Sequence, residues 1–328
     1  MKINVKPFTI VVTGGLGFIG SRFIKYVYEN TPHNIINIDA ETYAANHNRI
    51  PEEISSNKER YRFLKMDICS NICEHKEVFE AEYVVNFAAE SHVDNSIVDG
   101  SPFIKSNVMG VFNLLELFKD APYLRKFVQI STDEVYGDME DYRDPCYATE
   151  SFPLKPSSYY SASKASADLL VQSAARTYGI DYLITRSCNN FGPGQDPEKF
   201  LPKIAKCIGE GTPVPVYGDG GQIREWIHVD DNVEIIYNLM MTAPHDQIYN
   251  IGSGYTCPNN HIIKMIGRAM GKAVDFDYVE DRLGHDRRYS LNCSKLRGVL
   301  LSDWKPKLFS DWIDDTYNTR DIVEARII

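Results

Sequence analysis

Two short segments carry side chains that could move protons in a redox reaction. Tyr160 and Lys164 have the spacing Tyr-x-x-x-Lys, and residues four apart on a helix share a face. An ammonium group beside a phenol favours the phenolate and lowers its pKa, so Tyr160 is a candidate base for a hydroxyl proton during hydride transfer. Taken alone, this spacing also fits two surface residues of a helix, because the chain holds 20 tyrosines.

The second segment, Thr132-Asp133-Glu134, follows the apolar run Phe127–Ile130. If that run is a strand, both carboxylates lie at its carboxyl end, where ligand sites form in α/β sheets. Their side chains diverge, so one could act as an acid and the other as a base on different atoms of one substrate. A solvated acidic turn is the alternative.

A glycine-rich turn indicates a dinucleotide site. Gly14, Gly17 and Gly20 follow one apolar run and open a helical pattern. Such glycines allow the tight turn, the approach of backbone N–H groups to a pyrophosphate and close packing of helix on strand. Asp39 ends the next apolar run, 19 residues after Gly20, where a carboxylate accepts both ribose hydroxyls and disfavours a 2′-phosphate. A helix-entry turn and a turn aspartate are the separate alternatives, but together the features predict NAD rather than NADP.

The elements that must position these groups alternate between short apolar runs and helical patterns. This alternation predicts an α/β fold with a Rossmann-type, doubly wound parallel sheet. Strands are expected at Thr9–Thr13, Ile35–Asp39, Arg62–Met66, Tyr83–Ala88, Lys126–Ser131 and Tyr182–Thr185. Helices are expected at Phe18–Asn30, Ser157–Tyr178, Asp230–Met241, Asn260–Met270 and Asp311–Arg326.

The pattern changes after residue 185, where proline and glycine cluster at 191–197 and 209–221. We expect residues 1–185, together with part of 226–251, to form the NAD-binding domain. Residues 186–328 are expected to form mainly a smaller α/β substrate-binding domain. No linker separates the two regions, so they can be interleaved.

The overall composition argues against some classes of binding partner. Lys plus Arg is 35 and Asp plus Glu is 45, a formal net charge of −10, which argues against a broad cationic face for nucleic acid or membrane. No apolar run approaches the length of a membrane span. The seven cysteines contain no Cys-x-x-Cys pair, so neither a disulfide framework nor a zinc site is predicted. We expect a cytoplasmic, soluble protein with no metal.

Longer motifs resemble those of the extended short-chain dehydrogenase/reductases. Within these enzymes they resemble the nucleotide-sugar 4,6-dehydratases, with the dTDP-glucose 4,6-dehydratases closest. The motifs are FAAESHVDNSI at 87–97, STDEVYG at 131–137, YSASK at 160–164, CNNFGP at 188–193, QIR at 222–224 and DRLGHDRRY at 281–289. The resemblance covers nearly the whole chain.

This resemblance implies a hydride-shuttle reaction on a nucleoside-diphosphate glucose, dTDP-glucose or UDP-glucose, with NAD retained as a prosthetic group. Tyr160, helped by Lys164 and Thr132, would take the 4-hydroxyl proton while hydride passes from C4 to NAD. Glu134 would then remove the C5 proton, and Asp133 would protonate the leaving 6-hydroxyl. Return of hydride to C6 would give the 4-keto-6-deoxy sugar.

The resemblance also implies two sets of binding residues. Those expected to hold NAD are Gly14, Gly17, Phe18, Ile19, Gly20, Asp39, Asp67, Ile68, Ala88, Ala89, Ser106, Tyr160, Lys164 and Asn190. Those expected to hold the nucleotide sugar are Ser91, Thr132, Asn189, Lys199, Phe200, Pro215, Tyr217, Arg224, Asn259, Arg282 and His285. The two arginines would clamp the diphosphate, because a planar guanidinium pairs with phosphate oxygens. For either arginine alone, a surface charge is the alternative.

Other functions stay open. Nucleotide-sugar 4-epimerases and UDP-glucuronate decarboxylases resemble the same pattern with serine or another small residue in place of Asp133. A non-catalytic NAD-binding regulator is disfavoured, because the complete catalytic set is present. Tyr159, Gly194 and Asp196 depart from the family pattern, which usually has proline at the first position and aromatic residues at the other two.

The resemblance finally implies a homodimer. The helix that contains Tyr160 and a helix over Pro102–Phe118 would pair with their mates in a four-helix bundle. Burial in the core of one chain is the alternative for their apolar side chains, which are Leu114, Leu115, Phe118, Leu169 and Leu170.

Overall fold

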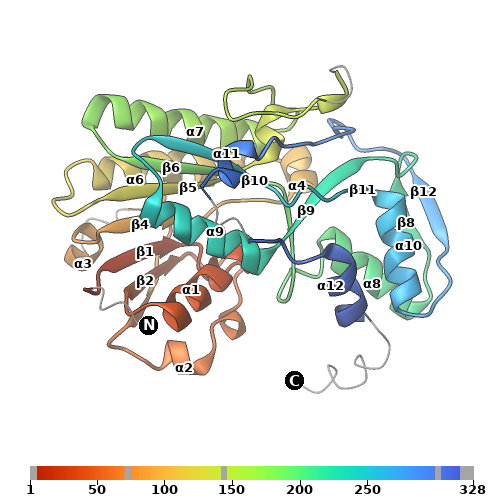
Figure 1. Cartoon of the computed structure of the whole chain (residues 1–328), viewed down its shortest axis with the longest axis horizontal. Helices are drawn as coiled ribbons and strands as arrows, with labels where there is room; N and C mark the ends of the chain where they lie inside the picture. Colours follow the sequence, from red (N-terminus) through yellow and green to blue (C-terminus); the bar gives the residue numbers. More distant parts are fainter. Residues whose placement is uncertain (1–5, 71–74, 142–145, 300–303, 318–328) are drawn as a thin grey trace.

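A parallel sheet forms the centre of the molecule (Figure 1). The computed structural model describes residues 6–70, 75–141, 146–299 and 304–317, and within these ranges seven strands pair in parallel in the order β10-β6-β5-β4-β1-β2-β3. The strands are β1 (Thr9–Thr13), β2 (Asn34–Asp39), β3 (Tyr61–Lys65), β4 (Tyr83–Asn86), β5 (Lys126–Thr132), β6 (Tyr182–Ser187) and β10 (Gln247–Ile251). Each predicted strand is present, with ends shifted by two residues at most. The predicted Rossmann-type α/β fold is confirmed.

Helices cover both faces of this sheet (Figure 1). In β1, Ile10 and Val12 pack on one face with α1 (Phe18–Asn30) and α9 (Val229–Thr242). Val11 packs on the other face with α6 (Gly110–Phe118) and α7 (Tyr159–Tyr178). A strand buried on both faces is apolar along nearly its whole length, which is why β1 could be predicted from the sequence.

The helix predicted over Pro102–Phe118 contains a π-helical turn. Helix α5 (Ser101–Phe103) continues through the π-helical segment η2 (Ile104–Met109) into α6. In α6, Leu114, Leu115 and Phe118 are buried in the core of the chain. These three residues therefore do not supply dimer surface, and that part of the expectation is wrong.

A second group of elements lies beyond β6. Strands β7 (Asn189–Phe191), β9 (Ile223–His228) and β11 (Thr256–Pro258) form one small sheet, and β8 (Val214–Tyr217) pairs with β12 (Phe276–Val279). They pack with α8 (Phe200–Glu210), α10 (Asn259–Ala269) and α12 (Phe309–Tyr317) around a separate apolar core. Of the helix predicted over Asp311–Arg326, residues 318–326 lie outside the described residues.

Short elements complete the described chain. They are η1 (His47–Arg49), α2 (Glu52–Ser55), α3 (Lys76–Phe79), α4 (Val93–Val98), η3 (Asp133–Tyr136), η4 (Met139–Asp141) and α11 (Ser294–Arg297). In the portions of the chain that the structure describes, no helix is both long and apolar enough to cross a membrane.

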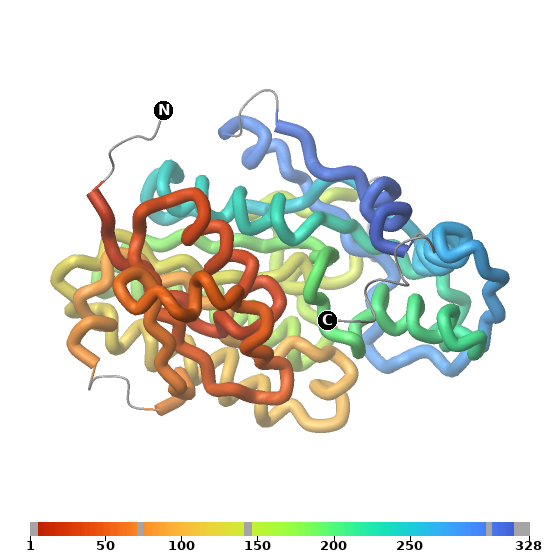
Figure 2. Tube along the Cα trace, turned by 90° about the horizontal axis from the view of Figure 1, so that it is seen from below, coloured from red at the N-terminus to blue at the C-terminus, as the bar shows by residue number. Residues whose placement is uncertain are grey.

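The chain returns to the main sheet after building β9. Helix α9 lies beside α1, where Arg22 and Asp230 form an ion pair of 2.5 Å, and β10 then pairs with β6. Figure 2 shows this returning segment, coloured teal, running back over the red N-terminal elements. Strand β9 thus belongs to the second group of elements, whereas α9 and β10, which follow it directly in the sequence, pack with the main sheet.

Candidate active site

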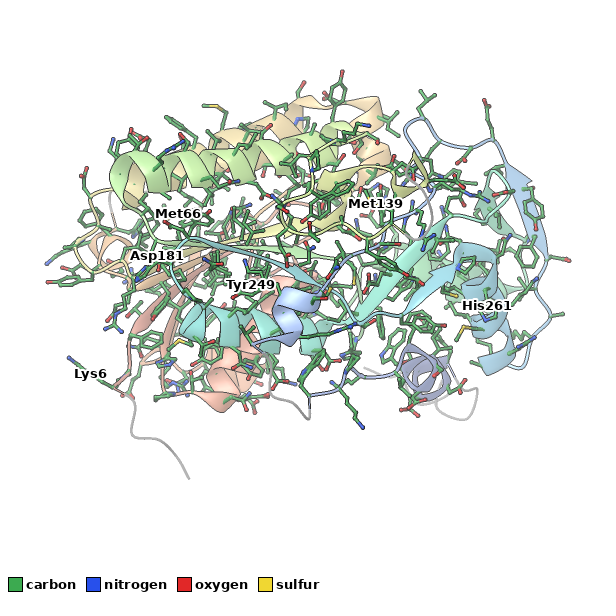
Figure 3. All side chains as sticks on the ribbon, turned by 45° about the horizontal axis from the view of Figure 1, so that its top comes forward. Lys6, Met66, Met139, Asp181, Tyr249 and His261 are labelled. Atoms are coloured by element: carbon green, nitrogen blue, oxygen red, sulfur yellow. The ribbon has the colours of Figure 1, made fainter. Side chains whose placement is uncertain are left out.

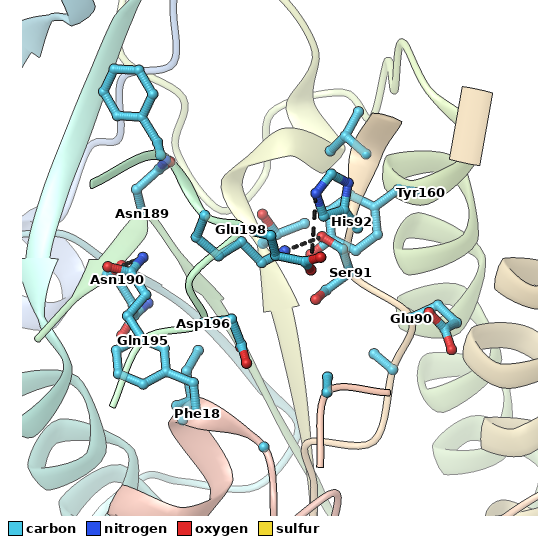
Figure 4. A pocket seen from close by; sticks show the side chains of 18 of the residues that line it. Phe18, Glu90, Ser91, His92, Tyr160, Asn189, Asn190, Gln195, Asp196 and Glu198 are labelled. Carbon is cyan, nitrogen blue, oxygen red and sulfur yellow. Dashed lines mark hydrogen bonds and ion pairs between the residues drawn. The ribbon is translucent and has the colours of Figure 1, made fainter. Parts of the chain in front are cut away.

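One large cavity, of about 890 Å³, lies where the carboxyl ends of β1, β2, β4, β5 and β6 meet the second group of elements. The predicted catalytic residues and both predicted sets of binding residues all line this cavity. Figure 4 shows Phe18, Ser91, Tyr160, Asn189 and Asn190 around it. The cavity also has the position at which open α/β sheets bind ligands.

The glycine turn brings the start of α1 to the cavity wall. Gly14 has φ +68°, and a Cβ there would lie 2.6 Å from the backbone nitrogen of Ala88. A Cβ on Gly20 would overlap the carbonyl oxygen of Gly14. No side chain of the described residues caps α1, whose first turn contains no acidic residue. The free N–H groups of this helix start therefore fit a pyrophosphate, as NAD requires.

Substitution of Gly20 by alanine is expected to weaken NAD binding and to lower the free energy of unfolding by about 1–3 kcal/mol. The added methyl group would force α1 away from the turn that it must contact. Thermal unfolding and titration with NAD measure the two effects.

The matched control is Gly209→Ala in α8, where the added Cβ would meet a single methyl carbon of Met270 at 3.7 Å. Alanine there should leave stability unchanged or raise it, because glycine is a poor helix former. Equal behaviour of the two variants would contradict the close-packing argument.

Asp39 fixes the shape of the same turn. One carboxylate oxygen accepts from the backbone N–H of Leu16 at 2.9 Å, and the other accepts from that of Glu41 at 2.8 Å. The carboxylate also lines the cavity, so the residue predicted to bind the ribose holds the glycine turn as well.

Helix α7 brings Tyr160 and Lys164 to the cavity. It begins after Ser158, whose hydroxyl accepts from the backbone N–H of Ser161 at 3.1 Å in a capping box. The buried Lys164 Nζ donates to the carbonyl oxygen of Ile130 on β5 at 2.5 Å. Burial lowers the pKa of Lys164 to about 8, an effect that the neighbouring Asp168 opposes.

The pKa of Tyr160 differs from the sequence-based expectation. Burial raises it above its usual value, Glu134 and Asp133 raise it further, and a hydrogen bond with Thr132 lowers it. The expectation of a lowered pKa is wrong for the net value, because burial and two carboxylates near the phenol raise it while the lysine is bonded to a strand carbonyl.

The acidic pair follows β5 directly. The Thr132 hydroxyl accepts from the backbone N–H of Glu134 at 3.3 Å and donates to Asp133 Oδ1 at 3.2 Å. Asp133 is 2% exposed, and within the described chain its Oδ2 has no hydrogen-bond partner. Burial raises the pKa of Asp133 well above its usual value, and Glu134 and Glu225 raise it further. Burial thus favours the protonated form of Asp133, which is the form that can donate a proton.

Glu134 faces the cationic side of the cavity. Burial raises its pKa, whereas Arg282 and Arg224 lower it. The Arg224 guanidinium is held by the carbonyl oxygens of Ile223 and Asp286, at 2.9 and 2.8 Å. Its position at the cavity is thus set by backbone rather than by an opposing carboxylate.

Arg282 is more loosely held. Its Nη1 pairs with Asp94 Oδ1 at 3.0 Å, and the other carboxylate oxygen accepts from the Tyr217 hydroxyl at 3.3 Å. Lys199 Nζ donates to the carbonyl oxygen of Ser91 at 3.2 Å. The two predicted diphosphate-binding arginines and Lys199 thus all lie close enough to Glu134 to act on it electrostatically.

Arg49 is a residue that the sequence did not single out. Its guanidinium pairs with Asp196 at 2.5 Å and donates to the carbonyl oxygens of Gly194, Leu16 and Ala44 at 3.0, 3.1 and 2.7 Å. It thus ties the glycine turn to the segment that departs from the family pattern. Its partners are mostly backbone atoms far away in sequence, which no residue pattern reveals.

Asn107 on the π-helical segment positions the loop after β4. Its side-chain amide donates to the carbonyl oxygen of Glu90 at 3.0 Å and to the Ser163 hydroxyl at 2.8 Å, and its Oδ1 accepts from the Glu90 N–H at 2.8 Å. This loop carries Ser91 into the cavity. Across the described residues, no group of three or more His, Cys, Asp or Glu side chains could hold a metal ion.

Comparison with known proteins gives a consistent result. The profile of the NAD dependent epimerase/dehydratase family matches residues 10–252. The low-salt glycan biosynthesis protein Agl12 of Haloferax volcanii is 42% identical over 91% of this chain and 93% of its own length. A dTDP-glucose 4,6-dehydratase of Haemophilus influenzae is 40% identical over the same fractions.

Solved structures share the fold over nearly the whole chain. DesIV, a dTDP-glucose 4,6-dehydratase of Streptomyces venezuelae solved with NAD bound, has a TM-score of 0.89 and 37% identity, covering 97% of this chain and 98% of that one. A UDP-glucuronic acid 4-epimerase of Bacillus cereus, solved with UDP-glucuronic acid and NAD, has a TM-score of 0.86 and 26% identity, covering 95% and 98%. Because the family profile spans most of the sequence and the relatives align over nine-tenths of it, the chain belongs to the NAD dependent epimerase/dehydratase family.

Proposed function

We propose that this protein is an NAD-dependent dTDP-glucose 4,6-dehydratase, a lyase that forms dTDP-4-keto-6-deoxyglucose. The observation that carries the proposal is the buried Asp133, whose pKa is raised, beside Glu134 and Tyr160 in one cavity. Loss of water across C5 and C6 needs an acid and a base in addition to the group that accepts the 4-hydroxyl proton. Relatives named dTDP-glucose 4,6-dehydratase support this reaction.

Residues around the glycine turn would hold NAD. The start of α1 would bind the pyrophosphate, and Asp39 would bind the adenosine ribose. NAD supplies the acceptor and donor of hydride in this reaction. We assign the binding of NAD to residues 1–185 with part of 226–251, and the binding of the sugar mainly to 186–328. The inclusion of α9 and β10 with the main sheet supports this division.

The chain's own side chains would move the protons. Tyr160, aligned by its hydrogen bond with Thr132, would take the proton of the sugar 4-hydroxyl. Lys164, mostly charged at neutral pH because its pKa is about 8, would stabilise the phenolate. Glu134 would remove the C5 proton, which the 4-keto group acidifies, and Asp133 would protonate the leaving 6-hydroxyl.

Incubation of the purified protein with dTDP-glucose and with UDP-glucose tests the proposal. A 4-keto product, detected by its absorbance in alkali, is expected with dTDP-glucose as the better substrate. A 4-epimerase of the same fold would instead interconvert sugar epimers without loss of water, and a non-catalytic NAD-binding protein would form no product. Absence of 4-keto product from folded, NAD-loaded protein would overturn the proposal.

We assign the exposed surface of α4 to α7 to a homodimer contact, in place of the buried leucines named above. Helices α6 and α7 pack side by side, and this surface exposes apolar side chains. The exposed fraction is 88% for Val98, 49% for Met109, 42% for Phe112 and 58% for Leu169. A second copy of the chain, presenting the same surface, would cover them.

The expected result for Leu169→Glu is a monomer, because a charge buried between apolar helices is costly. Sedimentation at micromolar concentration measures the mass. The matched control is Leu308→Glu, at a leucine that is 60% exposed outside these helices, which should leave the dimer intact. A wild-type protein that sediments as a monomer would contradict the dimer.

A further inference from the structure

A buried ion pair that the proposed mechanism does not use lies behind the catalytic residues. Arg186 on β6 donates from Nε to Asp168 Oδ2 on α7 at 2.9 Å. Both side chains are almost fully buried, at 2% and 0% exposure. Asp168 is four residues after Lys164, so the two share a face of α7, and the carboxylate acts on the lysine electrostatically. The Asp168 carboxylate is thus a shared counter-ion for Arg186 and Lys164.

The same pair reaches both ends of the acid–base segment on β5 and η3. On one side, the Ser131 hydroxyl, next to Thr132, lowers the pKa of Asp168, although among the described residues neither Ser131 Oγ nor Asp168 Oδ1 has a hydrogen-bond partner. On the other side, Arg186 Nη1 donates to the Tyr136 hydroxyl at 3.0 Å, and its guanidinium lies over the Tyr136 ring at 5.0 Å.

Further bonds fix this arrangement to the sheet. The Tyr136 hydroxyl donates to Asn250 Oδ1 on β10 at 2.6 Å, and Arg186 Nη1 also bonds to the carbonyl oxygen of Glu150 at 3.2 Å. The bonds of this network therefore join α7, β6, η3 and β10 behind the cavity.

We infer that Asp168 and Arg186 are positioning residues of the proposed dehydratase. The Asp168 carboxylate favours the charged form of Lys164, and the ion pair fixes the Tyr136 end of the acid–base segment, so that the acid–base pair and the Tyr160–Lys164 pair keep one relative geometry. Neither residue lines the cavity. This inference rests on the proposed function, because it assigns Lys164 and the acidic pair their roles in that reaction.

The charges around Lys164 predict how its ionisation responds. On α7 it faces Tyr160 and Asp168, and on β5 it meets the Ile130 carbonyl oxygen. Arg186 comes from β6, and the acidic pair from η3 faces the Tyr160 phenol. Removing the Asp168 charge leaves two cations without a shared counter-ion, so the lysine would lose its proton at lower pH.

The test compares the pH dependence of kcat/KM for Asp168→Asn and the wild type with dTDP-glucose. Asparagine keeps the size of the side chain and an acceptor for Arg186. The expected result is that activity is lost on the alkaline side about one pH unit or more below the wild type, with NAD content unchanged. A uniform loss of activity, with no shift of the pH profile of kcat/KM, would overturn the inference that Asp168 keeps Lys164 charged.

The matched control is Asp181→Asn. Asp181 pairs with Lys126 at 3.6 Å, also nearly buried and also joining β5 to the chain before β6, but at the opposite end of the strands. Figure 3 shows Asp181 far from Met139, which lies just beyond η3. This variant should be less stable yet keep the wild-type pH profile, and an equal shift in both variants would overturn the inference.

Tyr136→Phe tests whether the network positions the segment that carries Asp133 and Glu134. This variant also tests the inference if Asp168→Asn does not fold. Loss of the hydroxyl removes one bond to Arg186 and one to Asn250 while the ring stays in place. We expect kcat to fall roughly tenfold or more with KM and NAD content little changed. An unchanged kcat would overturn the positioning role. If the wild type itself formed no 4-keto product, the proposed function, and not this inference alone, would fail.

Discussion

Asp133→Asn is expected to lower kcat for formation of the 4-keto-6-deoxy sugar by about 10²–10⁴-fold, the usual contribution of a positioned general acid. Asparagine has nearly the same shape and can still accept from the Thr132 hydroxyl, but it has no acidic proton for the leaving 6-hydroxyl. NAD binding should change little, because the glycine turn and Asp39 are untouched. Rates of product formation and titration with NAD measure the two quantities.

An isotope measurement locates the defect within the reaction. In Asp133→Asn, Glu134 can still remove and return the C5 proton, so deuterium from solvent should accumulate in sugar that has not lost water. In the control variant Glu134→Gln, neither exchange nor product is expected. Unchanged turnover in Asp133→Asn would show that this carboxyl is not the acid.

The pH dependence of the wild type follows from the same carboxyl. Because burial and Glu134 raise the pKa of Asp133 well above its usual value, its acid form persists to higher pH than in a free carboxyl group, and activity should fall as the pH rises through that pKa. Lys164, whose pKa is about 8, contributes to the loss on the same side. The alkaline limb therefore reports two groups, and in Asp133→Asn the limb should reflect the lysine alone.

Tyr160→Phe is expected to abolish the reaction at its first step, with kcat lower by about 10²–10⁴-fold. The phenylalanine ring can keep the edge contact with Phe103, whose centroid lies 6.3 Å away, so folding should be preserved. Without the phenol, the 4-hydroxyl proton has no acceptor, and deuterium exchange at C5 should disappear together with the product. This loss of exchange distinguishes the variant from Asp133→Asn.

The neighbouring tyrosine provides the control. Tyr159 is 62% exposed, so Tyr159→Phe should keep wild-type kcat and exchange. Loss of activity in both variants would indicate a general disturbance of α7 rather than loss of the proton acceptor.

The sequence predicted best those features that depend only on residues close together in the chain. Buried strands such as β1 are continuous apolar runs, and the glycine turn has fixed spacing, so both were located closely. Motif resemblance then brought residues from distant strands into one predicted site, and the structure places them around one cavity.

Properties set by distant neighbours could not be predicted. The pKa of Tyr160 depends on carboxylates from η3 and on burial, whereas the sequence showed only the lysine four residues away. Arg49 is held mainly by backbone carbonyl oxygens, which have no sequence signature. The burial of Leu114 depends on which face of α6 meets the sheet, and in an apolar helix that choice is set by packing.

The π-helical turn between α5 and α6 lowers the stability of the helix but places Asn107 where it can bond to the loop after β4. A π-turn holds an extra residue and is a poorer helix than the regular one on either side. Deleting one residue there would restore regular hydrogen bonding and turn every preceding side chain by about 100° relative to α6. Asn107 would then leave the loop that carries Ser91. The π-helical turn thus makes the helix less stable, and in return the Asn107 amide reaches the loop after β4.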